Sequence, residues 1–322
     1  MKRISKYDNI KALLIICVVF GHLATPYKND SHLLRSLTIF IYMFHMPAFI
    51  FLSGLFHKKA SLKKAGLYFI YAYVLKFILF LTKSALGLSA NWDWTHEASV
   101  PWYLIVIAEY EILFILFEKL DKRLILGLSI IISLFSGYIP INDFFCLDRA
   151  MSFLPFFTVG YLSNKKKLLK LNTTKNKILG CGMVIFAAAC CSFWKFYYMR
   201  GWFTGRRTYE YLSSRAPMDI YNFAWLIKAV TLLISFGLIY ALIMLIPNKR
   251  IKGFTYLGER TFQIYYWHRP LCYLIYVSGL YPEIHGSSPV IADIFIILTT
   301  LLISYILSIS PKGLKSPSPT IC

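Results

Sequence analysis

Long apolar segments alternate with short polar ones along nearly the whole chain, and this alternation predicts its secondary structure. A helix needs about 20 mostly apolar residues to cross the hydrocarbon core of a bilayer. The pattern therefore predicts an all-α integral membrane protein with about ten transmembrane helices in one domain, 1–311, followed by a short polar tail, 312–322. The predicted helices cover 9–27, 37–56, 67–90, 101–118, 124–141, 150–163, 178–194, 221–247, 259–280 and 289–311.

The composition supports the same class of protein. Hydrophobic residues make up 57% of the chain and charged residues 16%, whereas soluble proteins average ~45–50% and ~25%. The net charge of +20 comes from short basic clusters between the apolar segments, which is typical of membrane topology and argues against nucleic-acid binding. The seven cysteines show no spacing typical of a zinc site or a disulfide framework, so no metal centre is predicted.

The basic residues also predict the orientation of the chain. When the loops are assigned alternately to the two sides, one side holds 21 Lys and Arg and the other holds 8. Cytoplasmic loops are the ones enriched in Lys and Arg, so both termini are predicted to be cytoplasmic, with an even number of spans. The frequent use of Lys, Ile, Phe and Tyr is typical of an AT-rich bacterial genome, and the predicted location is a bacterial cytoplasmic membrane.

One predicted outer loop, 195–220, departs from this charge pattern, because it combines five basic residues with many aromatic ones. Arg206 and Arg207 lie near its centre. Arginine together with aromatic rings suits the binding of a sugar or an anionic polymer. The alternative is an aromatic belt at the membrane interface whose charges are simply solvated.

Ionisable side chains at membrane depth are costly and therefore mark candidate functional sites. His22, His45, Glu109 and His268 all fall at a similar depth in their predicted helices. Histidine is well suited to take a proton from a hydroxyl group near neutral pH. The alternative for each histidine is a structural role as a hydrogen-bonding group between helices.

Lys11 and His22 are predicted to share one face of the first helix. Eleven residues at ~100° each turn ~1100°, only ~20° past three full turns, and separate the two side chains by ~16 Å along the axis. A cation at the inner mouth, below a deeper imidazole, suits a channel that admits an anionic donor. Asp8, one turn before Lys11, is positioned to pair with it.

Four segments, in this order, resemble the membrane acyltransferase-3 family, and especially its branch of fucose 4-O-acetylase-like proteins. The first two are YDNIKALLIICVVFGHL, similar to the family's Arg/Lys-x10-His helix, and FHMPAFIFLSGLF, similar to its second helix ending in Ser-Gly. The other two are PWYLIVIAEY, similar to a helix start with Trp-Tyr/Phe-Leu, and LGERTFQIYYWHRPL, similar to a late helix ending in Tyr-x-x-His. The resemblance extends from residue 7 to about residue 271.

The resemblance implies transfer of an acyl group, usually acetyl, from cytoplasmic acetyl-CoA to a hydroxyl of an extracellular or lipid-linked glycan. His22 matches the family's catalytic histidine, and Lys11 matches the basic partner linked to the donor. Many members have Arg at the latter position, and Lys lacks its planar fork. In a genome of this kind, a capsular or other surface polysaccharide is the expected acceptor. Motif positions of less settled role are matched by Ser53, Trp102, Tyr265 and His268, with His45 as a further candidate substrate contact.

The implied reaction requires a base for the hydroxyl and stabilisation of an oxyanion. His22 is predicted to act as general base or as covalent acyl carrier, with His268 and Glu109 as further catalytic candidates. The phosphates of CoA require cations near the inner mouth, and Lys58 and Lys59 are candidates unless they only set topology. A competing class is a transporter or exporter of a glycan or small polar solute, which also places charged residues inside the membrane. Transporters often contain internal repeats, and none is visible in this sequence.

Overall fold

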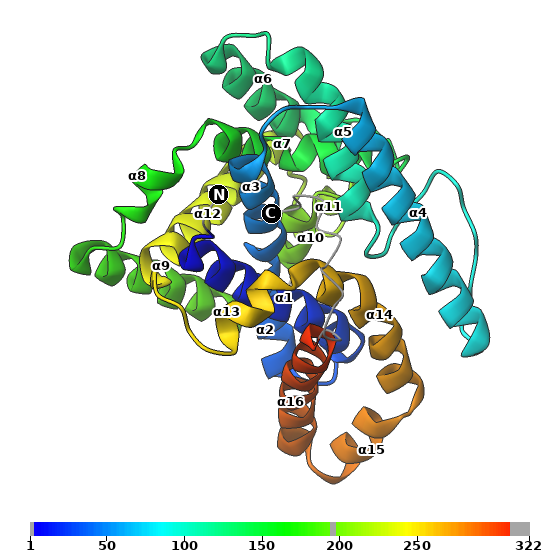
Figure 1. Ribbon diagram of the computed structural model, residues 1–322. Coiled ribbons are helices and arrows are strands. Elements are labelled where there is room, and N and C mark those ends of the chain that lie inside the picture. The colour runs from blue at the N-terminus through cyan, green and yellow to red at the C-terminus, as the bar shows by residue number, and fades with distance from the viewer. Residues whose placement is uncertain (1–2, 194–197, 310–322) are drawn as a thin grey trace.

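The computed structural model describes residues 3–193 and 198–309, and helices make up most of it (Figure 1). The prediction of an all-α fold is confirmed. The predicted tail, 312–322, and the first residues of the predicted outer loop, 195–197, lie outside the described residues. The first elements along the chain are α1 Ser5–Ala24, η1 Thr25–Tyr27, α2 His32–Tyr42, α3 His45–Phe56, α4 Leu62–Ala85, α5 Trp102–Phe117, α6 Lys122–Phe135, η2 Ser136–Tyr138, α7 Leu147–Leu162 and α8 Lys165–Leu169. They are followed by α9 Thr174–Ser192, α10 Arg200–Thr204, α11 Tyr209–Ser213, η4 Tyr221–Phe223, α12 Ala224–Leu245, α13 Phe254–Glu259, α14 Thr261–Val277, α15 Leu280–Ser287 and α16 Pro289–Ser308.

Six helical segments of the described chain are long and apolar enough to cross a membrane, as in a polytopic membrane protein. The four other predicted spans correspond to α5, α6, α7 and α14, which have 16, 14, 16 and 17 residues. These helices are short because neighbouring residues form separate elements, such as η2 after α6 and α13 before α14. For these four, membrane crossing stays a prediction. The six segments are Ser5–Tyr27, His32–Phe56, Leu62–Ala85, Thr174–Ser192, Tyr221–Leu245 and Pro289–Ser308.

α1 is the central helix of the bundle, and it contacts α2, α3, α13, α14 and α16 (Figure 1). In the most apolar 18-residue stretch of each helix, 72% of the residues are buried in α1, against 28% in α4 and 17% in α9. α4 and α9 expose large apolar side chains instead, as expected of helices that face lipid tails. Lys11 and His22 therefore belong to a helix that is enclosed by other helices.

The beginning of α1 is fixed by contacts with the segment that precedes α14. The side-chain amide of Asn9 donates hydrogen bonds to the carbonyl oxygens of Pro247 (3.1 Å) and Lys249 (2.9 Å). Gly258 of α13 lies so close to α1 that an added Cβ atom would be 1.7 Å from the carbonyl oxygen of Asp8. We call this the N-terminal end of the bundle, and the opposite end, where α1 stops, the distal end.

The second predicted span, 37–56, lies within one segment that is long and apolar enough to cross a membrane, His32–Phe56, but the helix is interrupted inside it. Met43 and Phe44 separate α2 from α3. Pro47 explains the interruption, because it has no N–H group to donate to the Met43 carbonyl one helical turn earlier. That carbonyl accepts a hydrogen bond from Ser235 Oγ of α12 at 2.6 Å instead, so the freed backbone group stays satisfied inside the bundle.

Candidate active site

His22 and His268 form a pair towards the distal end of the bundle. His22 lies in the last turn of α1 and His268 in α14, with 5.2 Å between their ring centroids. His268 is fully buried, whereas the half-buried His22 ring borders open space. Arg269 donates to the backbone carbonyl of His22 at 3.4 Å, which links the two helices at this level. The structure thus brings together two of the three residues predicted to be catalytic.

Hydrogen bonds indicate which nitrogen of His268 carries a proton. Nδ1 lies 3.1 Å from the carbonyl oxygen of Ile264 and 2.8 Å from that of Tyr265. Because a carbonyl only accepts, Nδ1 must be the donor. Nε2 is then the unprotonated nitrogen of the neutral ring, and this buried atom has no hydrogen-bond partner within the described part of the chain. His268 therefore has a lone pair that can accept a proton.

His45 is held in a similar way. It is the first residue of α3, and its Nδ1 lies 2.8 Å from the carbonyl oxygen of Ile41 in α2. Its ring is 5.0 Å from the ring of Tyr42, over which the guanidinium of Arg200 lies at 4.2 Å. The interruption between α2 and α3 thus places His45 beside the same open space that His22 borders.

A cavity of about 1160 Å³ occupies the distal end. Small-molecule sites typically have ~300–1,000 Å³, so this space is large enough for an extended acceptor. Its walls come from α1, α3, α5, α7 and α14 and from the segment 198–220, which are far apart in the sequence. Of the residues predicted from the sequence, those that line it are His22, His45, Trp102, Tyr265, Arg206 and Arg207.

A second, narrow cavity of about 30 Å³ lies next to the large one. The two share Val18, Met46 and Tyr265 as lining residues. The narrow cavity also borders Ile15 of α1 and Thr261, the first residue of α14. Because these residues are nearer to the N-terminal end than the histidines, the narrow cavity extends the open space in that direction. Its lining is mostly apolar and aromatic.

One face of α1 follows this route. Lys11, Ile15, Val18 and His22 are spaced four, three and four residues apart, which places them on one side of a helix. Lys11 is buried at the beginning of this face and forms an ion pair with Asp8 at 2.9 Å, as the sequence suggested. Ile15, Val18 and His22 of this face thus line the two cavities. Lys11 is not among the described residues that line either cavity, and a carboxylate already balances its charge.

The remaining motif residues form the walls between helices. The hydroxyl group of Tyr265 donates to the carbonyl oxygen of Val100, and its ring packs 5.7 Å from that of Tyr103. The Tyr103 hydroxyl in turn is hydrogen-bonded to Ser53 Oγ at 2.8 Å. Ser53 therefore supports the wall through Tyr103, whereas Trp102 lines the large cavity itself.

Glu109 lies away from the histidine pair. Its charged neighbour is Asp148 at the start of α7, and it is not among the described residues that line either cavity. Its Oε2 atom is buried and has no hydrogen-bond partner in residues 3–193 and 198–309. A similar depth along the membrane normal does not bring a residue to the site when its helix turns it towards another neighbour. The catalytic role of Glu109 stays a prediction that this geometry does not support.

The N-terminal end carries exposed cations. Lys58 and Lys59 are exposed directly after α3. The amine of Lys165 in α8 lies 4.3 Å from the ring centre of Phe56 and close to Lys58. Burial, and then the nearby charge of Lys58, lowers the pKa of Lys165. Neighbouring cations of this kind make the end of the bundle electropositive and suited to phosphate groups.

Several residues of the site were not among the candidates predicted from the sequence, and three of them lie close to the histidines. Arg200 lies in the predicted outer loop, whose basic and aromatic composition was the available signal. Arg269 directly follows His268, but nothing in its spacing indicated the contact with the backbone of α1. Tyr42 lines the cavity beside His45 and had no distinguishing sequence signal. Within the described residues, no group of three His, Cys, Asp or Glu side chains is placed to hold a metal ion.

Comparison with known families identifies one match, to a family model described as an acyltransferase domain, over residues 4–309. The match covers nearly the whole chain and includes every residue of the candidate site. Neither the curated proteins nor the solved structures provide a significant match.

Proposed function

Since this chain belongs to the acyltransferase domain family and is a membrane acyltransferase, we propose that it is an O-acetyltransferase in which His22 is the reacting centre. Its donor is an acyl-CoA, as in the family generally, and we take this donor to be acetyl-CoA. The proposed acceptor is a hydroxyl of a bacterial surface polysaccharide, such as a capsule, or of its lipid-linked precursor. The proposed location is the bacterial cytoplasmic membrane, with both termini in the cytoplasm.

The position of His22 carries this proposal. On the face of α1 that lines both cavities, His22 lies one turn beyond Val18, which borders the two cavities, and faces the large cavity alone. A donor that enters from the N-terminal end and an acceptor that enters from the distal end would meet at this imidazole. Acyl transfer between two compartments requires such a meeting point, because the thioester and the hydroxyl come from opposite sides.

In the direct route, His22 takes the proton of the acceptor hydroxyl while its oxygen attacks the carbonyl carbon of the thioester. The tetrahedral intermediate then collapses, the carbon–sulfur bond breaks, and the CoA sulfur takes the proton from the imidazolium. We assign His268, whose ring lies beside that of His22, to position the His22 ring. The unprotonated Nε2 of His268 can accept a proton from His22.

In the relay route, a nitrogen of His22 attacks the thioester first and CoA leaves as its thiol. The acceptor hydroxyl then attacks the acyl-imidazole, the carbon–nitrogen bond breaks, and the hydroxyl proton reaches the released imidazole of His22, either directly or by way of His268. Both routes end with an ester, free CoA and neutral histidine. They differ in whether the enzyme is acylated when no acceptor is present.

The narrow cavity supports the choice of acetyl. At about 30 Å³ it offers room for a small group beside Val18 and Tyr265, whereas a long acyl chain requires a much larger apolar space. On the same proposal, the phosphates of CoA stay at the N-terminal end. Lys58, Lys59 and Lys165 are the exposed or partly exposed cations assigned to them there.

The test compares His22→Gln and His22→Ala with His285→Gln, a matched change in the short distal helix α15. Glutamine keeps hydrogen bonding but takes up no proton at neutral pH. We expect both His22 variants to accumulate normally and to lose at least ~10²-fold in the rate of labelled acetyl transfer from acetyl-CoA to membrane glycan. His285→Gln should retain the wild-type rate. Near-normal transfer by a well-expressed His22→Gln variant would remove His22 from the chemistry.

A further inference from the structure

The wall of the large cavity is strongly positive. Six basic residues line it, and no Asp or Glu does so among the residues that the structure describes. The segments outside the description, 1–2, 194–197 and 310–322, contain no Asp or Glu either. The six basic residues are Lys28, Arg149, Arg200, Arg206, Arg207 and Arg215.

We propose that the acceptor is an acidic saccharide, whose carboxylate or phosphate group binds to Arg207 and Arg215 while its hydroxyl reaches His22. This inference rests on the proposed function, because it names the substrate class of the same site. A neutral sugar would leave the positive charges of Arg207 and Arg215 unbalanced. An oxyanion replaces that repulsion with charge-assisted hydrogen bonds, and the positive wall attracts it from solution.

The protein balances only part of this charge itself. The Asp143 carboxylate pairs with Arg149 at 3.0 Å and also with Arg206. Arg149 is buried and also donates to the carbonyl oxygen of Glu97 at 3.2 Å, so its guanidinium is held in place by protein groups. Asp148 is a second carboxyl group near Arg149, and it lines the small pocket that Arg206 and Arg207 also border. The charge that calls for an external anion is therefore that of Arg207 and Arg215.

Arg207 and Arg215 are placed to hold the anionic group. Both guanidinium groups lie against the ring of Tyr211, at 4.6 and 4.8 Å from its centre. Within the described chain, neither takes part in an ion pair. Contact with a ring uses the face of the guanidinium, whose N–H groups lie in its plane and can still donate to an oxyanion. On this proposal the two arginines, which both contact the Tyr211 ring, hold the carboxylate or phosphate, and we call them the clamp.

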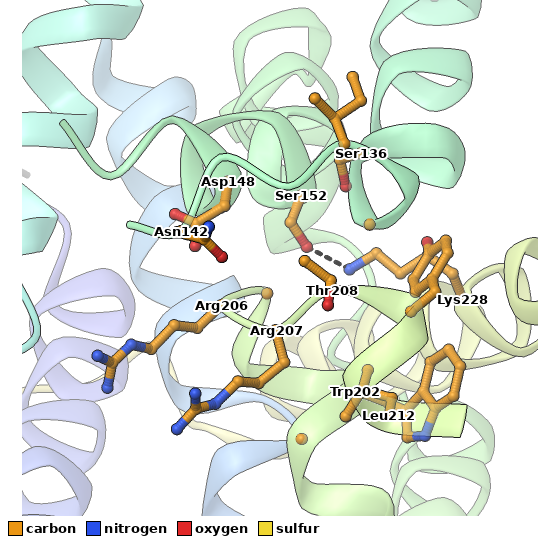
Figure 2. A pocket seen from close by; sticks show the side chains of 15 residues that line it. Ser136, Asn142, Asp148, Ser152, Trp202, Arg206, Arg207, Thr208, Leu212 and Lys228 are labelled. Carbon is orange, nitrogen blue, oxygen red and sulfur yellow. Dashed lines mark hydrogen bonds between the residues drawn. The ribbon is translucent and has the colours of Figure 1, made fainter. Parts of the chain in front are cut away.

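Acidic residues of the same segment line a neighbouring hollow rather than the large cavity itself. Glu210 of α11 lines this surface hollow together with Asp219, and the hollow shares Ala216, Pro217 and Met218 with the large cavity. Figure 2 shows Arg206 and Arg207 extending side by side, away from Lys228, whose amine donates to Ser152 in a small adjacent pocket. The arginines of this segment thus line the large cavity, whereas its carboxylates line the adjoining hollow.

Aromatic rings complete the site for a sugar. Trp102, Trp202 and Tyr211 line the same cavity as the arginines. The faces of such rings pack against the apolar faces of sugar rings, while polar groups around them take the hydroxyls and charges. The combination fits an acidic saccharide better than a free inorganic anion, which needs no aromatic surface.

The first experiment identifies the glycan that the chain acetylates. Surface glycan from cells expressing the wild-type chain or His22→Ala is compared by mass spectrometry. We expect acetyl groups that depend on His22, on a repeat unit that contains a uronic acid or a phosphate. A neutral repeat unit as the acetylated product would overturn the proposal, and so would a neutral unit acetylated only while attached to its lipid diphosphate. If no glycan shows acetylation that depends on His22, the proposed function itself fails.

The second experiment tests the clamp with defined probes. Tetragalacturonate and its fully methyl-esterified form have the same sugars, but only the first carries charge. We expect the acid to inhibit acetyl transfer to the isolated glycan and the ester to inhibit at least about tenfold less. In Arg207→Gln and Arg215→Gln this difference should shrink, with a raised KM for the glycan and an unchanged KM for acetyl-CoA.

The control is Arg123→Gln, which removes an exposed arginine at the N-terminal end of α6. It should leave both inhibition constants at their wild-type values. The proposal is wrong if the methyl ester inhibits as well as the acid, or if neither inhibits. It is also wrong if the Arg207 and Arg215 variants raise KM for acetyl-CoA instead, because the clamp would then bind the donor.

Discussion

The crossing of α3 and α7 leaves space only for hydrogen atoms at two glycines, and this makes a sharp test of the packing that holds His45. A Cβ atom added to Gly54 would be 2.0 Å from the carbonyl oxygen of Phe157, and one added to Gly160 would be 2.0 Å from that of Phe51. Ordinary van der Waals contact begins at 3.4 Å. Because the obstacles are backbone atoms, alanine at either position must push the two helices apart by more than about 1 Å.

The magnitude follows from the cost of overpacking. Forcing extra methyl groups into a close-packed contact typically costs ~1–3 kcal/mol, and small residues are what allow membrane helices to approach this closely. We expect Gly54→Ala and Gly160→Ala each to destabilise the protein in that range. The double variant should cost less than the sum, since one displacement of the helices relieves both contacts.

Two other glycines supply the control. Gly66 in α4 and Gly182 in α9 are exposed, and an added Cβ would have no atom within 4 Å. Alanine at these positions should be neutral or stabilise by up to ~1 kcal/mol, because it favours the helix. The sign of the effect is therefore predicted to reverse between the two pairs of otherwise identical substitutions.

The assay is the unfolding temperature of the purified protein in detergent, together with its acetyl-transfer rate. Displacement of α3 also moves His45, and a shift of about 1 Å near a reacting centre can cost up to ~10²-fold in rate. We expect the Gly54 and Gly160 variants to lose activity and the Gly66 and Gly182 variants to keep it. Equal unfolding temperatures for all four would show that α3 and α7 are not packed backbone to backbone.

Two further predictions concern the donor and the topology. Lys11→Arg should keep most activity, whereas Lys11→Ala should raise KM for acetyl-CoA. Lys11→Ala should also lower the abundance of the protein, because it leaves the buried Asp8 carboxylate without its cation. Initial rates of the double variant Asp8→Asn/Lys11→Met separate the two effects, and an unchanged KM for acetyl-CoA in that variant would remove Lys11 from donor binding. Reporter fusions after residues 60, 170 and 252 should read cytoplasmic and those at 95, 145 and 207 outside, as the loop charges predict, and a cytoplasmic signal at 207 would contradict the assignment of the arginine-rich loop.

The fold was predictable where the length of an apolar segment determines the structure. Apolar stretches such as those of α1, α4, α12 and α16 leave few alternatives to a membrane helix. The interruption between α2 and α3 was hidden, since both sides of it are apolar. Pro47 was its visible signal, but a proline alone does not reveal whether a helix kinks or stops. That outcome depends on a partner such as Ser235, which is distant in the sequence.

Rotation about the helix axis explains which site residues could be predicted and which could not. Counting along a helix yields the depth of a residue, and within α1 it also yields the rotation that places Lys11 and His22 on one face. Between helices the rotation depends on packing, so depth alone grouped Glu109 with histidines from which the structure separates it. The placement of Arg207 and Arg215 against Tyr211 required still more, because it depends on the local folding of α11 and its flanking turns. The composition of that segment suggested an anionic or sugar ligand without excluding solvated charges, and the residues proposed to hold such a ligand follow only from the three-dimensional arrangement.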